Sequence, residues 1–250
     1  MLVDGIGAVV FDFYGTLVRM VEPLPPDHHG IFARRGLADQ GELWGDQWSV
    51  GPGEGEEHTA HSTDEATYTA WERARLRRRA RVCGVPEDAL DGLVDELDRA
   101  MKAIRLELFP DVLDVLAALR SRGLLVGVCS NWFWNLEQCV EETGLAGAVD
   151  VVVGSARAGA RKPHPLIYRE LLDRCALPPR RVLFVGDMWV PDVLGPLDAG
   201  MRAVHVHRPD RAVEGETPPL PAGAARINGL GSLLTGATEP GGGGGQGGCG

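Results

Sequence analysis

The feature that most restricts the fold of this chain is a series of five short apolar segments that alternate with helical patterns. The five segments are rich in Val, Ile and Leu, and most of them lack the polar–apolar alternation of a strand with one exposed face. Such strands are buried on both faces, as in a parallel sheet covered by helices. The segments are Ile6–Phe13, Leu124–Asn131, Val149–Ser155, Arg181–Asp187 and Arg202–Arg208.

Four helical patterns follow the same rhythm along the chain. Each begins near a proline or a polar residue and ends near a glycine or a proline, the residues that start and stop helices. The alternation of strands and helices predicts an α/β fold built on a doubly wound, parallel, five-stranded sheet. The expected helices are Asp111–Arg122, Trp132–Thr143, Pro165–Ala176 and Val190–Ala199.

The stretch between the first and second strands interrupts this rhythm. It starts with the proline-rich "EPLPPDHHG", continues with "VGPGEGEEHTAHSTDE", which we expect to form a mobile loop, and ends in two or three amphipathic helices. We therefore predict a core of residues 1–18 and 109–236, an inserted helical cap at 19–108 that contains the Gly-rich loop, and a disordered Gly-rich tail at 237–250.

The composition excludes some partners. A formal net charge of −10 over 250 residues argues against nucleic acid, which is bound through a basic surface, but a local pocket can still take a small anionic substrate. No apolar stretch approaches the roughly 20 residues of a membrane span, and no signal-like start is present, so we expect no membrane partner and a cytoplasmic protein. Five cysteines without a CxxC pair fit reduced thiols. A monomer and a homodimer remain equally open.

Polar residues stand at the predicted ends of four strands. Ligands of an open parallel sheet bind at the carboxyl ends of its strands, so we expect these residues to converge on one crevice. Each has a simpler interpretation alone, as a helix cap, a turn residue or a surface charge. Four such segments in order favour a site. They are Asp12 to Thr16 in "DFYGT", Ser130 and Asn131 in "CSN", Lys162 in "RKPHP", and Asp187 and Asp192 in "GDMWVPD".

The residue types in this set suggest a chemistry. Clustered carboxylates repel one another, so a cation must keep them ionised. Asp12 and Asp187, with a backbone carbonyl and waters, suit octahedral Mg²⁺. Asp12 beside a cation and Lys162 is a plausible nucleophile toward phosphorus or carbon. Ser130, the Asn131 backbone N–H and Lys162 would bind the anionic part of a substrate.

With these four segments the chain resembles the haloacid dehalogenase-like hydrolases. The resemblance covers Ile6–Pro209 and rests on "FDFYGTL", "VCSN", "RKPHP" and "VGDMWVPD". It implies a Rossmann-like core, with a small helical cap between the first and second motifs that closes over the site and shapes substrate choice. The implied roles are Asp12 as nucleophile and metal ligand, Tyr14 as metal ligand through its carbonyl, Thr16 as organiser of the first loop, Ser130 and Asn131 as binders of the transferred group, Lys162 as the neutralising cation, Asp187 as metal ligand, and Asp192 as an acid of the metal site that orients Lys162 or metal-bound water.

Tyr14 complicates the choice of reaction. Phosphatases of this family usually carry a second aspartate at this place, and a phenol with a pKa near ~10 is a poor general base at neutral pH. The Asp-x-Tyr-Gly-Thr form resembles the 2-haloacid dehalogenases, which need no metal, and Tyr168 fits that subgroup as well. Asp187 points instead to a metal-assisted phosphoryl transfer. The leading prediction is a Mg²⁺-dependent phosphatase of a small phosphate monoester. The alternatives are an (S)-2-haloacid dehalogenase and a catalytically weak binding protein.

Some side chains have roles that depend on this choice. A dehalogenase needs a cap arginine for carboxylate or halide, and Arg34 and Arg35 lie in the right region. A phosphatase lacking the second aspartate could protonate its leaving group through His28, His29 or the Tyr14 phenol.

Two further groups stand near the predicted strand ends. His205 and His207 share one face of the fifth strand and are more typical of a hydrogen-bonded or solvent-facing pair than of metal ligands. Of Trp132, Trp134 and Trp189, we expect at least one to face the mouth of the crevice.

Overall fold

A computed structural model describes residues 2–22, 24, 27–45, 53–208 and 218–236. All five predicted strands are present in one parallel sheet, but the predicted number was one too small. The sheet has six strands in the order β5-β4-β1-β6-β7-β8. Their bounds are β1 Ala8–Phe11, β4 Leu125–Ser130, β5 Val151–Gly154, β6 Val182–Gly186, β7 Arg202–Val206 and β8 Ala224–Ile227.

The additional strand, β8, pairs in parallel with β7 at the edge of the sheet. Its sequence is Ala-Ala-Arg-Ile, and its first two residues are only partly buried. A four-residue edge strand with two alanines lacks the apolar run that identified the other five strands.

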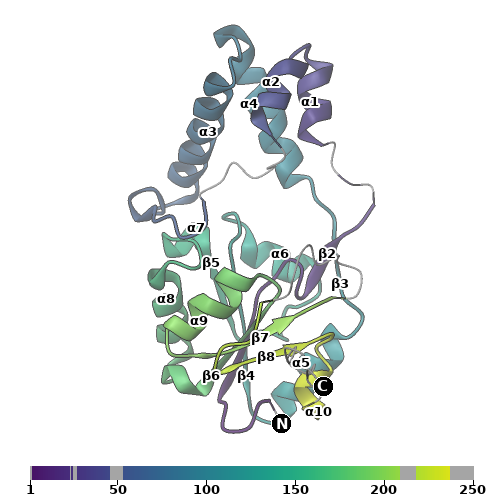
Figure 1. Ribbon diagram of the computed structural model, residues 1–250, viewed down its shortest axis with the longest axis vertical. Helices are drawn as coiled ribbons and strands as arrows, with labels where there is room; N and C mark the ends of the chain where they lie inside the picture. Colours follow the sequence, from purple (N-terminus) through teal and green to yellow (C-terminus); the bar gives the residue numbers. More distant parts are fainter. Residues whose placement is uncertain (1, 23, 25–26, 46–52, 209–217, 237–250) are drawn as a thin grey trace, which may run out of the picture.

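Helices cover both faces of the sheet (Figure 1). α5 (Val112–Ser121), α6 (Leu136–Glu142) and α10 (Ser232–Thr235) lie on one side, and α7 (Ser155–Ala158), α8 (Pro165–Cys175) and α9 (Gly195–Asp198) lie on the other. In β1, Val9 and Phe11 pack with α5 and α6, whereas Ala8 and Val10 pack with α8. This burial of both faces explains the uninterrupted apolar runs.

Two of the predicted helices differ in detail. The segment predicted as Val190–Ala199 starts as a π-helical turn, Trp189–Leu194, and continues as α9. The helix predicted from Trp132 begins only at Leu136. Its first residues are held in a loop because the Ser155 hydroxyl contacts both the N–H and the carbonyl of Trp132, each at 3.1 Å.

The segment between β1 and α5 forms a helical unit, called here the cap. Its helices are α1 (His28–Arg34), α2 (Ala38–Trp44), α3 (Glu65–Val82) and α4 (Glu87–Lys102), and they enclose an apolar cluster of their own. Two short antiparallel strands, β2 (Val18–Met20) and β3 (Leu106–Leu108), pair where the chain leaves and re-enters the core. The sequence patterns predicted α3 and α4 but not α1 and α2, which follow the proline-rich stretch.

The described part of the Gly-rich stretch is bonded to the core. Residues 53–62, called here the docked loop, include a short 3-10 helix, Thr59–His61. The His58 N–H donates to the Gly159 carbonyl at 2.7 Å, the Arg161 N–H to Glu56 at 3.0 Å, and the Gly55 N–H to Lys162 at 3.2 Å. The sequence predicts a mobile loop here, and these backbone bonds correct that prediction for residues 53–62. Residues 46–52 and the predicted tail at 237–250 lie outside the described residues.

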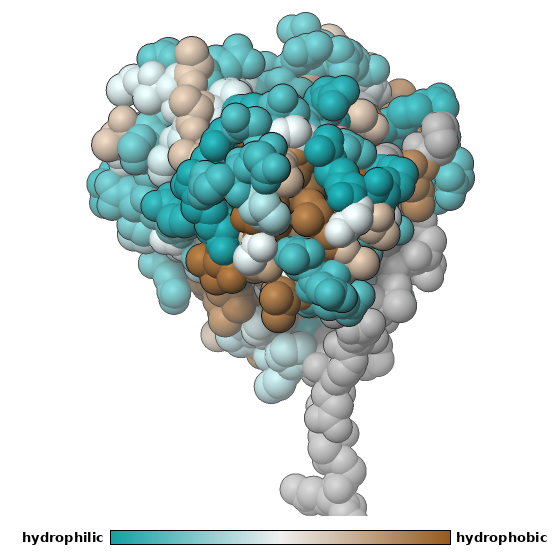
Figure 2. Space-filling model, turned by 90° about the horizontal axis from the view of Figure 1, so that it is seen from above, coloured by the Kyte–Doolittle hydropathy of each residue, from teal (hydrophilic) through white to brown (hydrophobic). Residues whose placement is uncertain are grey.

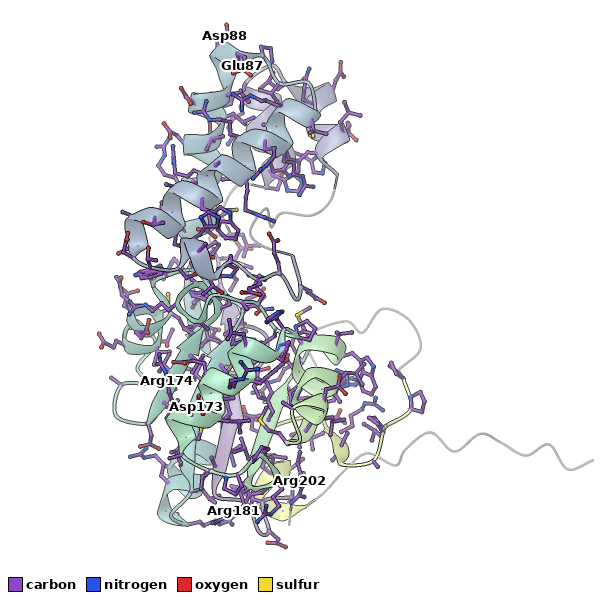
Figure 3. All side chains as sticks on the ribbon, turned by 90° about the vertical axis from the view of Figure 1, so that its left-hand side faces the viewer. Glu87, Asp88, Asp173, Arg174, Arg181 and Arg202 are labelled. Atoms are coloured by element: carbon purple, nitrogen blue, oxygen red, sulfur yellow. The ribbon has the colours of Figure 1, made fainter. Side chains whose placement is uncertain are left out.

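The cap stands at the carboxyl end of the sheet. Arg181 and Arg202 lie at the starts of β6 and β7. Figure 3 shows them at one end of the molecule, with Glu87 and Asp88 of the cap at the opposite end. The strands therefore run toward the cap. Seen from the cap end, the surface is mainly hydrophilic, with a small group of hydrophobic residues near its centre (Figure 2). Within the described ranges, no helix has both the length and the apolar character needed to cross a bilayer.

Candidate active site

Asp12 lies directly after β1, in the middle of the sheet, and is largely buried. Its backbone N–H donates to the Val185 carbonyl of β6 at 2.8 Å, which extends the strand pairing to the residue itself. Its Oδ1 accepts hydrogen bonds from Lys162 Nζ at 2.7 Å and from Ser130 Oγ at 2.9 Å. The carboxylate is thus held by Ser130 at the end of β4 and by Lys162. The sequence predicts Lys162 at the end of a strand, but it lies in the connection between α7 and α8.

Lys162 is the cation of the site. Its ammonium group is 1% exposed and donates to Asp12 Oδ1 at 2.7 Å, to Asp192 Oδ1 at 2.6 Å and to the Cys129 carbonyl at 2.9 Å. All three of its protons are therefore used. Burial alone would lower the pKa of Lys162, but the carboxylates of Asp12 and Asp192 outweigh this effect and raise it above the ordinary value. Lys162 remains charged.

The Asn131 side chain holds the backbone of Lys162. Its Oδ1 accepts from the Lys162 N–H at 2.7 Å, and its Nδ2 donates to the Lys162 carbonyl at 3.0 Å. The side-chain amide is thus used within the protein, which leaves the backbone N–H as the group predicted to bind a substrate.

Three carboxylates meet at this edge of the sheet. Asp12, Asp187 and Asp192 each offer an oxygen, and these oxygens all lie within 4.8 Å of one another. Hard oxygen donors at this spacing fit Mg²⁺. Asp192 is the most engaged of the three, because its Oδ1 binds Lys162 and its Oδ2 accepts from the Met188 N–H at 3.0 Å. Burial raises the pKa of Asp192, and the charge of Lys162 opposes that shift. Asp12 and Asp187 are therefore better placed as direct ligands, with Asp192 behind them.

A buried arginine fixes the loop that follows Asp12. Arg208 donates to the Thr16 carbonyl through Nε at 3.2 Å and Nη2 at 2.6 Å, and its Nη1 contacts both oxygens of Asp111 at 2.8 and 2.9 Å. The Thr16 hydroxyl in turn donates to Asp187 Oδ1 at 3.4 Å. This arrangement connects the first loop, the start of α5 and the end of β7 to a predicted metal ligand.

His205 of β7 and His207, which follows the strand, form a hydrogen-bonded pair, one of the two arrangements predicted. His207 Nε2 lies 3.1 Å from His205 Nδ1, and His205 Nε2 lies 2.9 Å from the Asp187 carbonyl. His205 must therefore donate from Nε2 to that carbonyl. The pair supports the backbone of Asp187.

The predicted aromatic residues are distributed around the site. The Tyr14 ring lies 6.5 Å from the Trp132 ring, and Trp132 is mostly buried against Phe13. Trp134 lies 5.9 Å from Tyr68 of the cap. Trp134 and Trp189 are partly exposed, so they are the tryptophans that can face the mouth of the crevice.

Tyr168 packs inside the core. It is 1% exposed, and its hydroxyl donates to the Pro191 carbonyl at 2.5 Å. This contact gives Tyr168 a structural role in holding the π-helical turn.

The cap residues considered for catalysis are engaged within the cap. Arg34 and Arg35 contact Glu96 at 3.1 and 2.6 Å. His28 is buried, with Nε2 2.7 Å from the Gly45 carbonyl. His29 lies 4.0 Å from Glu42. These contacts give the four residues roles within the cap.

Sequence reasoning missed the Arg208–Asp111 pair and a group of buried polar side chains that includes His58, Glu72 and Arg161. Arg208 was assigned to the end of a strand, and that position is the signal that could have identified it, because polar strand ends revealed the other site residues. The cap-side group has no such signal, since its members come from three distant segments.

Comparison with known proteins identifies relatives among hydrolases. The family model of haloacid dehalogenase-like hydrolases matches residues 6–200. The chain is 34% identical over 130 residues to haloacid dehalogenase-like hydrolase domain-containing protein 3 of Danio rerio and 33% identical over 137 residues to a phosphoserine phosphatase of Thermus thermophilus. These alignments cover 51% and 54% of the chain, and the chain spans about half of these relatives, 54% in both cases.

Solved structures share the fold across nearly the whole chain. A phosphatase from Thermococcus onnurineus aligns with a TM-score of 0.59 at 21% identity, covering 92% of this chain and 97% of that one. A 2-haloacid dehalogenase from Pseudomonas syringae aligns with a TM-score of 0.56 at 24% identity and the same coverage. The six-stranded sheet, the four motifs gathered at its carboxyl edge and the family match lead to one conclusion: this chain belongs to the haloacid dehalogenase-like hydrolases.

Proposed function

We propose that this hydrolase is a Mg²⁺-dependent phosphatase that acts on a small phosphate monoester through an aspartyl-phosphate at Asp12. One observation carries the proposal: Asp187 lies with Asp12 and Asp192 in a cluster whose oxygens are within 4.8 Å of one another. Lys162 can neutralise part of this charge, since it touches Asp12 and Asp192. A divalent cation held by Asp12 and Asp187 would offset the charge of the three neighbouring carboxylates.

The residues present support the first chemical step. Asp12 Oδ1 is held by Lys162 and Ser130, so the carboxylate is fixed in orientation. Its Oδ2 is then the oxygen that attacks phosphorus, and the bond between phosphorus and the ester oxygen breaks. Asp12 and Asp187 would hold Mg²⁺, which when bound offsets the charge of the phosphoryl oxygens. Ser130 and the Asn131 backbone N–H would bind those oxygens.

The second step needs water to attack the aspartyl-phosphate, which releases inorganic phosphate and restores Asp12. Tyr14 stands where the family's phosphatases usually carry the aspartate that assists both steps. The leaving alcohol therefore takes its proton from water or from the Tyr14 phenol, and we expect turnover to be slow.

A 2-haloacid dehalogenase is the second candidate, favoured by Tyr14 itself. In that reaction Asp12 would displace halide from carbon, and water would then hydrolyse the resulting ester. The contacts of Arg34 and Arg35 with Glu96 weaken this candidate, because they occupy the cap arginines that we expected to bind carboxylate or halide.

Two assays separate the candidates. Hydrolysis of p-nitrophenyl phosphate is measured with Mg²⁺ and with EDTA, and halide release is measured from 2-chloropropionate. We expect phosphate release that requires Mg²⁺ and disappears in Asp12→Asn. Halide release without metal would instead establish the dehalogenase. Phosphate release that survives Asp12→Asn would contradict the mechanism, and inactivity in both assays would favour a binding protein.

A further inference from the structure

Arg161 lies in the core, and its positive charge forms no ion pair with the described residues. It precedes Lys162, and its side chain lies near Tyr68, Glu72 and Arg75 of α3. The residue is half-buried, and its Nε is buried without a hydrogen-bond partner among the described residues. A buried donor in this state is costly, and a bound acceptor would remove that cost.

His58, on the docked loop, presents a second buried atom without a partner. The residue is 3% exposed, and its Nε2 makes no hydrogen bond among the described residues. Its Nδ1 lies 2.9 Å from Ser62 Oγ, while that hydroxyl donates to the His58 carbonyl at 3.3 Å. Because the hydroxyl proton is used there, Nδ1 carries the ring proton and Nε2 is left as an acceptor.

The two side chains belong to one place. Burial and the charge of Arg161 both lower the pKa of His58, to about 4, so the ring is neutral and within electrostatic reach of the guanidinium. The His58 ring also packs against Tyr68 and Trp71 of α3, at centroid distances of 5.6 and 4.9 Å. A cationic donor and a neutral acceptor thus lie within electrostatic reach of each other where the docked loop and α3 meet the core.

The neighbouring acids are engaged elsewhere or neutralised. Glu56 binds Arg75 at 2.5 Å and the Gly53 N–H at 2.8 Å. Glu72 is hydrogen-bonded to Tyr68, and burial raises its pKa to about 7, so it supplies only part of a counter-charge. Glu54 is exposed and forms no ion pair with Arg161 among the described residues.

We propose that Arg161 and His58 bind the part of the substrate remote from the reacting phosphate, and that this part carries a carboxylate beside a hydroxyl group. The carboxylate pairs with the Arg161 guanidinium, which suits it as a planar, multiple donor. The hydroxyl donates to His58 Nε2. Arg161 directly precedes Lys162, whose carbonyl accepts from the Asn131 side chain, so a ligand there is adjacent to the catalytic motif. The inference rests on the proposed phosphatase and specifies its substrate class.

The test uses two esters that differ at one position. 3-Phosphoglycerate carries a carboxylate where glycerol 3-phosphate carries a hydroxymethyl group, and both keep the neighbouring hydroxyl. We expect the full-length enzyme to prefer 3-phosphoglycerate by at least about tenfold in kcat/KM, the worth of one charge-assisted contact. In Arg161→Met this ratio should fall to about one through KM. Arg169→Met, which removes an exposed arginine of α8, should keep the wild-type ratio.

Equal use of the two esters by the wild-type enzyme, or an unchanged ratio in Arg161→Met, would overturn the subsite. If neither ester nor p-nitrophenyl phosphate is hydrolysed, the proposed function fails, and calorimetry with D-glycerate decides the subsite separately. Binding of D-glycerate to the wild-type protein that weakens at least about tenfold in Arg161→Met supports the subsite, while no binding to the wild type refutes it. The wild-type results decide the matter even if a variant does not fold.

Discussion

Lys162 joins two buried carboxylates, and its removal should affect both stability and chemistry. In Lys162→Met, Asp12 and Asp192 would lose their shared cation while remaining buried. We expect loss of activity and a decrease of about 3–5 kcal/mol in the free energy of unfolding, the cost of breaking a buried pair from one side. Urea denaturation of the metal-free protein measures the second effect.

A double variant checks the cause of that decrease. Lys162→Met combined with Asp192→Leu removes one of the two carboxylates that lose their cation in the single variant. The double variant should recover part of the lost stability, although not the activity. If the single variant were as stable as the wild type, Lys162 would not be the counter-charge described here.

Glu72 should make the stability of the protein depend on pH. Burial raises its pKa from 4.5 to about 7, so between these values the folded protein binds more protons than the unfolded chain. Stability therefore falls as pH rises from about 4.5 to 7. Glu72→Gln removes the ionisation, and its gain over the wild type should grow from pH 5 to pH 8, toward an order of 3 kcal/mol.

Urea denaturation at the two pH values measures this difference. Glu65→Gln, which removes an exposed carboxylate from the same helix, controls for the general effect of charge. A Glu72→Gln gain that was equal at pH 5 and pH 8 would show that Glu72 ionises normally in the folded protein.

The end of β6 and the π-helical turn after it are packed too closely for any side chain at Gly186. A Cβ built there would lie 2.4 Å from the Asp192 carboxyl group. Gly186→Ala should therefore displace Asp192 from Lys162, lower the unfolding free energy by about 1–3 kcal/mol and reduce activity. Gly231→Ala places its methyl group in open space and should change neither quantity. A fully active Gly186→Ala enzyme would show that the position of Asp192 is not critical.

The elements differ in how much of them can be predicted from sequence. Five strands and the residues at their ends were predictable, since parallel strands buried on both faces give continuous apolar runs and end at one edge of the sheet. β8 was not, because its four residues carry no such run. Contacts across long sequence separations could not be predicted either. Arg208 contacts Asp111, 97 residues away, only because β7 and α5 are packed together in the fold. The Arg161 and His58 cluster depends in the same way on docking of the cap.

The whole molecule contains separate apolar clusters in the cap and in the core, which should differ in stability. Leu93 is fully buried in the cap cluster with residues of α1, α2 and α3. Leu93→Ala should cost about 2–5 kcal/mol and should loosen the cap before the sheet. Hydrogen exchange followed by mass spectrometry should then show faster exchange in α1–α4 and unchanged exchange in β1, β4 and β6. Equal acceleration in both parts would show that they unfold as one unit.

The docked loop belongs to the cap by its position in the sequence, but its backbone hydrogen bonds join it to the core. Gly55, Glu56 and His58 are bonded through the backbone to Gly159, Arg161 and Lys162, so we expect this loop to stay with the core if the cap helices shift. A hinge on this flank would then lie between the loop and the first turn of α3, and the Glu56–Arg75 ion pair would have to open. His58 and Arg161 would keep their positions while Tyr68 and Glu72 of α3 move away. A ligand would then contact His58 and Arg161 first, and Tyr68 and Glu72 only after the helices return.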